Sequence, residues 1–316
     1  MGDLERAVHT VVNQCLGVRP GEGVVVVADT GTRRMGNILR EAATGVGADA
    51  AILVMDPRGA DGEEPPTAVA AALAAADVFI VPTTRSLSHT RARRAATEAG
   101  ARGATLPGVT EDVLSRLMAC DLVTLQRRSR ALAELLTRAD DAHFTCPHGS
   151  DLRLDLFGRT GIADDGDLTR PGAFGNLPCG EGFVAPVGGD GVMYATSLGG
   201  AGPTSDGPVR LTVSDGELTD VDSPSGGRLL RALRDAGPHG ANLAELGVGT
   251  NERAGLSGNA LEDEKILGTV HVAFGRSAGL GGTVRVPIHL DCVVMSPTVD
   301  VGGIRVVEAG EFVLDA

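Results

Sequence analysis

Histidine, aspartate and glutamate side chains recur toward the C-terminal end of the chain at positions that suit metal binding. His271 lies in one stretch of alternating apolar and polar residues, and His289 and Asp291 lie two residues apart in another. Side chains alternate across the faces of a β-strand, so His289 and Asp291 share a face while their apolar neighbours point the other way. Glu245 is flanked by apolar residues in the same manner. Two imidazoles and two carboxylates arranged in this way predict a metal site with nitrogen and oxygen ligands.

A further candidate, Glu181, lies between Gly180 and Gly182 in another part of the chain. Flanking glycines allow close approach of backbone and leave the carboxylate uncrowded. Taken alone, however, a glutamate of this kind is usually solvated. A histidine and an aspartate two residues apart also occur as a simple hydrogen-bonded pair. The residue types by themselves leave a metal site and a structural explanation open.

The charged run Asp263-Glu264-Lys265 has a structural explanation of its own. Acidic residues in the first turn of a helix interact favourably with its dipole, and Asn259 or Ser257 is suited to cap that helix. We therefore interpret these three residues as structural, or as supports for the metal ligands.

Composition narrows the choice of partner. The chain has 316 residues, 42% of them hydrophobic, and a formal net charge of −13. The length is typical of two domains, and the negative charge argues against nucleic acid and against anionic membranes. We expect a small-molecule or short-peptide substrate and, as the commonest arrangement of soluble enzymes, a homodimer.

Apolar runs, the N-terminal residues and the cysteines indicate where in the cell the protein is located. No apolar run approaches the roughly 18–20 residues that a membrane span needs, and the first residues lack the pattern of a secretory signal. Five scattered cysteines without a Cys-x-x-Cys pair are typical of reduced thiols. We expect a cytoplasmic protein.

The first 140 residues alternate between helical and strand-like segments. Short apolar runs of the kind found in buried strands occur at 24–27, 51–55, 78–81 and 104–106. Continuous apolar strands separated by helices predict a parallel sheet covered on both faces. Residues 1–140 are therefore expected to form a doubly wound, Rossmann-like α/β domain.

From about residue 141 the periodicity changes to short alternating runs separated by turn residues. Residues 144–156 and 209–221 each predict a β-hairpin, the second with an Asp-Gly turn. Helices are expected at 225–236 and 259–268. Residues 141–316 thus predict a mainly antiparallel domain that carries the metal site, and the whole chain an α/β plus α+β fold.

The loop at 82–90 follows the third predicted strand and holds hydroxyls, an arginine and His89. Ligands of open α/β sheets bind beyond the carboxyl ends of the strands, so His89 is a candidate catalytic residue. The alternative is a polar loop in which Ser88 caps the next helix and His89 is an ordinary surface residue. The turn after the first strand lacks a nucleotide-binding glycine pattern.

Taken together, these segments resemble the aminopeptidase T (M29) family of metallopeptidases and its shorter relatives, which include the 2,5-dihydroxypyridine 5,6-dioxygenase. The similarity covers the C-terminal half closely, and the loop Thr84-x-Ser86-Leu87-Ser88-His89-Thr90 is similar to the shorter relatives. The resemblance implies that five residues are metal ligands: Glu181, Glu245, His271, His289 and Asp291. The matching segments are Asn176-Leu177-Pro178 with Gly180-Glu181, Glu245-Leu246-Gly247 with Gly249-Thr250-Asn251, Asp263-Glu264-Lys265, Gly268-Thr269 with His271, and Ile288-His289 with Asp291.

One feature of the sequence distinguishes the peptidases from their shorter relatives. The peptidases are similar to each other in using a tyrosine soon after the first ligand histidine, whereas residues 275–282 contain none and the only tyrosine is Tyr194. In the dioxygenase, the residues that resemble His271, His289 and Asp291 hold one iron. A set of two histidines and one carboxylate is typical of non-haem Fe(II) oxygenases.

Our main hypothesis is a metallohydrolase of the aminopeptidase or amidohydrolase type. Two divalent ions (Zn, Co or Mn) on the five ligands would activate a water molecule to attack an amide, with Glu181 carrying protons. The alternative is a ring-cleaving dioxygenase with one Fe(II) on His271, His289 and Asp291, His89 as base and Glu181 orienting a hydroxylated heteroaromatic substrate. A third hypothesis is a catalytically inert, metal-stabilised binding module.

Overall fold

The computed structural model describes residues 2–199, 201–205 and 207–315. The chain forms two compact units: Met1–Leu122 with Gly166–Cys179 as unit 1, and Val123–Asp165 with Gly180–Ala316 as unit 2. The chain leaves unit 1 after Leu122 and returns to it for residues 166–179. A division at residue 140 would instead assign helix α6 (Leu122–Arg138) to the first unit and residues 166–179 to the second.

Unit 1 is built on the parallel sheet that the apolar runs predict. Its strand order is β2-β1-β3-β4-β8, and every neighbouring pair is parallel. The strands are β1 (Gly23–Asp29), β2 (Asp49–Met55), β3 (Val78–Val81), β4 (Arg102–Thr105) and β8 (Phe174–Asn176). Strand β8 was not predicted as a member of this sheet. It pairs with β4 although about 70 residues separate them, and three residues with a central glycine carry no strand periodicity.

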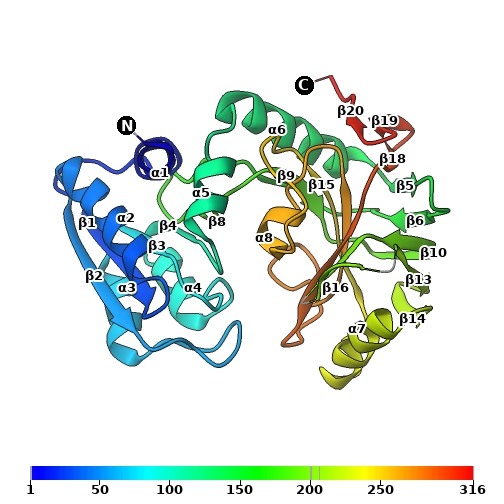
Figure 1. Ribbon diagram of the computed structural model, residues 1–316, viewed down its shortest axis with the longest axis horizontal. Helices are drawn as coiled ribbons and strands as arrows, with labels where there is room; N and C mark the ends of the chain where they lie inside the picture. The colour runs from blue at the N-terminus through cyan, green and yellow to red at the C-terminus, as the bar shows by residue number, and fades with distance from the viewer. Residues whose placement is uncertain (1, 200, 206, 316) are drawn as a thin grey trace. The chain divides into compact units, whose positions relative to one another are not determined.

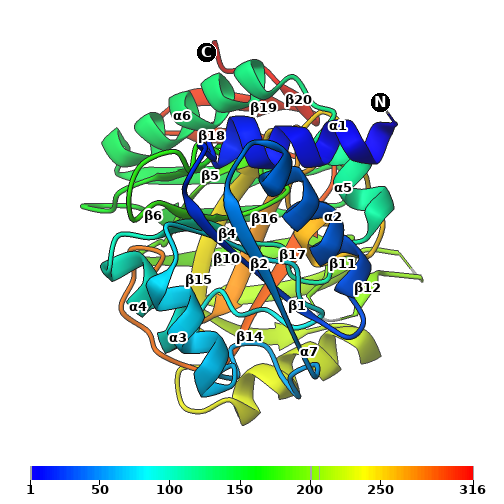
Figure 2. The same cartoon turned by 90° about the vertical axis from the view of Figure 1, so that its left-hand side faces the viewer.

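Helices lie on both faces of this sheet. Helix α2 packs directly on β1 and β2, where a Cβ on Gly36 would lie 2.8 Å from side-chain atoms of Ala28 and Ile52. On the other face, α3 and α4 pack through an apolar cluster that includes Leu73 and Phe79. Figure 2 shows α3 and α4, in cyan, lying together and apart from α1 and α2, in blue. The helices of unit 1 are α1 (Asp3–His9, continued by a π-helix at Thr10–Cys15), α2 (Arg33–Gly45), α3 (Thr67–Ala75), α4 (Arg91–Glu98) and α5 (Glu111–Leu117).

Unit 2 contains two antiparallel sheets, as the hairpin patterns predict. The eight-stranded sheet has the order β14-β13-β10-β6-β5-β18-β19-β20, and the seven-stranded sheet has the order β12-β11-β17-β16-β15-β9-β7. The strands of the first are β5 (Asp141–Thr145), β6 (Asp151–Asp155), β10 (Gly188–Ala195), β13 (Val209–Ser214), β14 (Glu217–Val221), β18 (Thr298–Val301), β19 (Ile304–Glu308) and β20 (Glu311–Phe312). The strands of the second are β7 (Ile162–Asp164), β9 (Glu181–Val184), β11 (Ser197–Leu198), β12 (Gly202–Pro203), β15 (Leu243–Gly249), β16 (Val270–Gly275) and β17 (His289–Val294).

Both sheets of unit 2 contribute to one apolar core. Phe144 and Met193 enter it from the eight-stranded sheet, and Leu246 and Val272 enter it from the seven-stranded sheet. Leucines of α6 and of α7 (Pro224–Asp235) complete the cluster, and α7 lies beside β14 (Figure 1). The short helix α8 (Ala260–Asp263) precedes β16. One face of the seven-stranded sheet is thereby committed to the core, which leaves the opposite face for polar side chains.

Within the described residues, none of the helices combines the length and the hydropathy that crossing a bilayer requires.

Candidate metal centre

Strand register gathers the five candidate ligands on one face of the seven-stranded sheet. Gly249 pairs with Glu181, Gly247 with His271, and Ala273 with both Glu245 and Asp291 on its two sides. Residues between these positions, such as Leu246 and Val272, point into the core. Since side chains alternate along a strand, the polar positions share the face opposite the core. The structure therefore brings together Glu181, Glu245, His271, His289 and Asp291, all in unit 2.

Small residues on this face make room for the cluster. A Cβ placed on Gly247 would lie 2.1 Å from Nε2 of His271 and 2.3 Å from Cε1, so the imidazole occupies the space above this glycine. Ala273 is the residue between Glu245 and Asp291 across the strands. A larger side chain at position 247 would displace the ring, because two non-bonded heavy atoms do not approach so closely.

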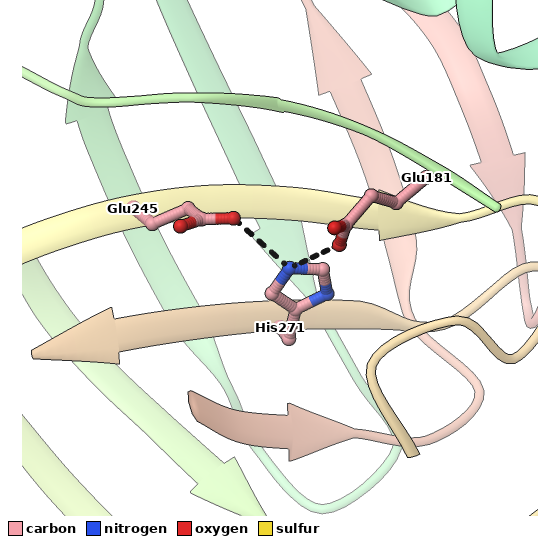
Figure 3. A group of neighbouring side chains, drawn as sticks. All are labelled: Glu181, Glu245 and His271. Atoms are coloured by element: carbon pink, nitrogen blue, oxygen red, sulfur yellow. Dashed lines mark ion pairs between the residues drawn. The ribbon is translucent and has the colours of Figure 1, made fainter. Parts of the chain in front are cut away.

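The ligand atoms form two overlapping groups. Nε2 of His271 lies 3.0 Å from Oε2 of Glu181 and 3.5 Å from Oε1 of Glu245, as Figure 3 shows. Nε2 of His289 lies 3.3 Å from Oε2 of Glu245 and 3.5 Å from Oδ1 of Asp291. In each group the ligand atoms lie within 4.8 Å of one another. Glu245 belongs to both groups and contacts both imidazoles.

Hydrogen bonding in the cluster fits a bound cation. Among the described residues, none is positioned to form a hydrogen bond with either ring nitrogen of His271 or with Oε2 of Glu181, although all three atoms are buried. The contact between Nε2 and Oε2 is therefore an ion pair without hydrogen-bond geometry. Buried polar atoms without hydrogen bonds are costly, and a metal ion supplies the missing partner for an imidazole nitrogen and a carboxylate oxygen.

His289 is oriented for the same purpose. Its Nδ1 lies 2.8 Å from the carbonyl oxygen of Arg276. A carbonyl only accepts hydrogen bonds, so Nδ1 carries a proton and Nε2 is the nitrogen that faces Glu245 and Asp291. A hydrogen bond of this kind from the distal nitrogen is typical of metal-binding histidines.

The electrostatics of the cluster also favour positive charge. Burial lowers the pKa of both histidines, but the carboxylates of Glu181 and Glu245 around His271, and of Asp291 and Glu245 around His289, raise each pKa well above its ordinary value. Burial raises the pKa of Asp291, but the neighbouring His289 lowers it by more, so that the pKa lies below its ordinary value and the carboxyl is ionised. A divalent cation satisfies the same carboxylates without protonating the imidazoles.

The charged run at 263–265 lies beside the cluster. Asp263 accepts hydrogen bonds from the Ser197 hydroxyl at 2.8 Å and from the backbone N–H groups of Ser257 and Gly258, which holds the loop before α8. Lys265 forms ion pairs with three carboxylates, one of which is Glu181. Asp164, another partner of Lys265, was not predicted as a site residue. A single aspartate in a three-residue strand shows no residue pattern that indicates a functional role.

His89 belongs to unit 1, on the turn between β3 and α4. Its side chain is half-buried, and its carbonyl oxygen accepts a hydrogen bond from Nη1 of Arg94 at 2.7 Å. The capping residue of α4 is Thr90 and not Ser88, whose hydroxyl bonds to Thr105. The catalytic role of His89 stays a prediction.

A cluster of two imidazoles and three carboxylates on one sheet, in a chain that also contains a doubly wound unit, is typical of a metal-dependent enzyme. The family model for NicX, 2,5-dihydroxypyridine 5,6-dioxygenase, matches residues 3–314. The chain therefore belongs to the 2,5-dihydroxypyridine 5,6-dioxygenase family. A search of curated protein sequences gives no match.

Two solved structures have the same fold. The structure of 2,5-dihydroxypyridine dioxygenase from Pseudomonas putida KT2440 superimposes with a TM-score of 0.84 at 20% identity, over 100% of this chain and 99% of the other. Wild-type AmpT from Thermus thermophilus superimposes with a TM-score of 0.71 at 20% identity, over 99% of each chain. The resemblance inferred from the sequence motifs is confirmed.

Our main hypothesis of an aminopeptidase-type hydrolase is wrong, because the family model that spans residues 3–314 is that of the dioxygenase. The error has a physical origin. The dioxygenase and AmpT have the same fold, and the five candidate metal ligands, on which our main hypothesis was based, are implied by the resemblance to the family as a whole. The absence of tyrosine from residues 275–282 was the feature that favoured the dioxygenase.

Proposed function

We propose that this protein is a ring-cleaving dioxygenase that uses one Fe(II) ion to open a dihydroxypyridine or a closely related hydroxylated N-heteroaromatic ring. The observation that carries this proposal is the match to the 2,5-dihydroxypyridine 5,6-dioxygenase family over residues 3–314. The two ligand groups of unit 2 support it, since through the shared Glu245 they together contain two histidines and several carboxylates, the residue types that non-haem iron enzymes use.

His271, His289 and Asp291 would hold the iron. The chemistry that iron(II) supplies when bound is the reaction of O2 with an aromatic ring that would not otherwise combine with it. A 2-His-1-carboxylate set leaves open positions on one side of the ion. Glu245 contacts both imidazoles at 3.3–3.5 Å and thereby restrains their separation.

The remaining residues would handle the substrate and its protons. Glu181 would accept a hydrogen bond from a ring hydroxyl or a ring N–H group and so orient the ring. His89 would take up the proton of a substrate hydroxyl, since an imidazole titrates near neutral pH. Both atoms of O2 enter the ring-opened product, so no external reductant is consumed.

Anaerobically purified protein reconstituted with iron(II) tests this proposal. With 2,5-dihydroxypyridine as the probe, we expect loss of the aromatic absorbance together with consumption of one O2 per ring. Catechol, which has two hydroxyls but no ring nitrogen, is the matched control. If the iron-loaded protein consumes no O2 with any dihydroxypyridine isomer, the proposed function is wrong.

A further inference from the structure

Lys265 is an unusual residue in this protein. It is the only lysine, in a chain whose other basic residues at neutral pH are arginines, and its side chain is 1% exposed. Lysine is almost never fully buried unless it is paired. An ammonium group has three N–H donors that can point in different directions, whereas a guanidinium presents its donors in a fixed plane. A buried lysine among arginines therefore calls for an explanation from its surroundings.

Three carboxylates from three elements surround the ammonium. Nζ lies 3.0 Å from Oδ2 of Asp164 at the end of β7 and 2.8 Å from Oε1 of Glu264 after α8. The third partner is Oε1 of Glu181, the first residue of β9. The ammonium thus forms an ion pair with each of the three carboxylates, and its contact with Glu181 is also a hydrogen bond.

Two of these carboxylates are direct neighbours in the sheet. Asp164 on β7 is paired with Glu181 on β9 in the antiparallel register. Like charges directly opposite each other across two strands repel, and here both side chains are nearly buried, at 11% and 7% exposure. Lys265 contacts both and is the cation that makes this pairing tolerable.

The backbone around Lys265 is built to reach this position. The N–H of Asn251 donates to the carbonyl of Lys265 at 3.0 Å. A Cβ on Gly249 would lie 2.1 Å from the carbonyl oxygen of Ile266, so only glycine lets this segment lie against β15. Gly249 is also the residue opposite Glu181. Gly249 therefore lets the segment that contains Lys265 lie next to Glu181, the carboxylate that Lys265 contacts.

The two oxygens of the Glu181 carboxylate have different partners. Oε1 is committed to the ammonium, and Oε2 lies 3.0 Å from Nε2 of His271. We propose that Lys265 is a positioning residue of the metal centre: it fixes the Glu181 carboxylate in one orientation and offsets the charge of Asp164 behind it. This inference rests on the proposed function only for the part that Glu181 plays toward the substrate.

The test uses Lys265→Met, which keeps the length of the side chain and removes its charge, and the double variant Lys265→Met/Asp164→Asn. The double variant also removes the neighbouring negative charge, so it guards against a simple failure to fold. Arg305→Met is the matched control, because Arg305 likewise pairs with two carboxylates of unit 2, Asp300 and Glu308, but at the surface. Affinity for cobalt(II), with its visible absorption spectrum, and kcat/KM for the dihydroxypyridine are measured for each.

If Lys265 positions Glu181, the affinity of the folded double variant for cobalt(II) and its kcat/KM for the dihydroxypyridine should each be roughly 10–100-fold lower than in the wild type. Losses of this size are usual for residues that orient metal-site side chains. In a Glu181→Gln background, the Lys265 substitution adds no further loss, because the residue that it acts through is already changed. The control Arg305→Met leaves both quantities unchanged.

The proposal is overturned if the double variant has wild-type metal affinity and kcat/KM, or if the losses from Lys265→Met and Glu181→Gln simply multiply. Failure of the proposed function gives a different result: the wild type then fails to oxidise dihydroxypyridine, while the cobalt(II) affinities of the variants still show whether Lys265 positions Glu181.

Discussion

At the scale of single residues, the metal centre depends on one position that has no side chain. Gly247→Ala would place a methyl carbon 2.1 Å from Nε2 of His271. The ring must move, so we expect metal affinity to fall by roughly 10–100-fold while the core on the other face of the sheet is retained. Isothermal titration with cobalt(II) measures the change.

The control for this substitution is Gly227→Ala on α7, where an added Cβ meets nothing within 4 Å. Alanine is the better helix former by roughly 0.5–1 kcal/mol, so this variant should be at least as stable as the wild type and bind metal normally. Wild-type affinity in Gly247→Ala would contradict the placement of His271 at the metal.

His289 and Asp291 allow a second test at this scale. They lie on one face of β17, and each contributes a ligand atom to the group around Glu245. Replacing either by alanine should abolish retention of iron through gel filtration, because a three-ligand site that loses one ligand also misdirects the other two. Metal analysis of the purified variants provides the answer, and an Asp291→Ala protein that keeps its full iron content would sink the ligand assignment.

At the scale of elements, an ion pair of unit 1 gives a pH dependence. Nη1 and Nη2 of Arg102, on β4, donate to the two carboxylate oxygens of Glu22, before β1, at 3.0 and 2.7 Å. The Arg102 hydrogen bonds hold the pKa of Glu22 below its ordinary value of 4.5 despite partial burial. A lowered folded-state pKa stabilises the fold above the unfolded pKa, and this stability is lost as the pH falls through the folded value.

Glu22→Gln should therefore lower the free energy of unfolding by about 1–2 kcal/mol at pH 7. Near pH 3 the difference should shrink, since the wild-type carboxyl then becomes protonated as well. Urea unfolding at the two pH values measures it. A deficit that is equally large at both would show that the charge of Glu22 is not what stabilises the fold.

The elements also show how far the sequence predicts the fold. The apolar runs located β1 to β4, and the Asp-Gly turn located the hairpin of β13 and β14, because these patterns are local. Helix α6 lies within the first 140 residues, which we expected to form the α/β domain, but its leucines pack in the core of unit 2. Periodicity identifies the face of a helix that is buried and not the core that buries it.

Part of the candidate site was likewise predictable from the sequence, and part was not. Alternation along the strands placed His289 and Asp291 on one face without knowledge of the fold, and the structure gathers all five predicted ligands. Lys265 was interpreted as structural or as a support for the metal ligands, but its contacts with Glu181 and Asp164 were not predictable, since they depend on burial and a lysine is ordinarily exposed. The reaction was misassigned because ligand types alone do not distinguish hydrolysis from oxygen chemistry.

At the scale of the whole molecule, the prediction for His89 tests whether a residue of unit 1 takes part in the reaction. If His89 is the base, His89→Ala should lower kcat by roughly 10²–10⁴-fold and leave iron content unchanged. His148→Ala is the control, since His148 is an exposed histidine of the hairpin between β5 and β6. Equal activity of the two variants would remove His89 from the mechanism.

We propose that this protein uses iron(II) to insert O2 into a hydroxylated pyridine ring. Mass spectrometry of the product formed under isotopically labelled O2 tests this reaction most directly. We expect a ring-opened product in which both newly introduced oxygen atoms carry the label, formed by protein that contains one iron per chain. A product that carries oxygen from solvent water in both positions, or formation of product without iron, would contradict it.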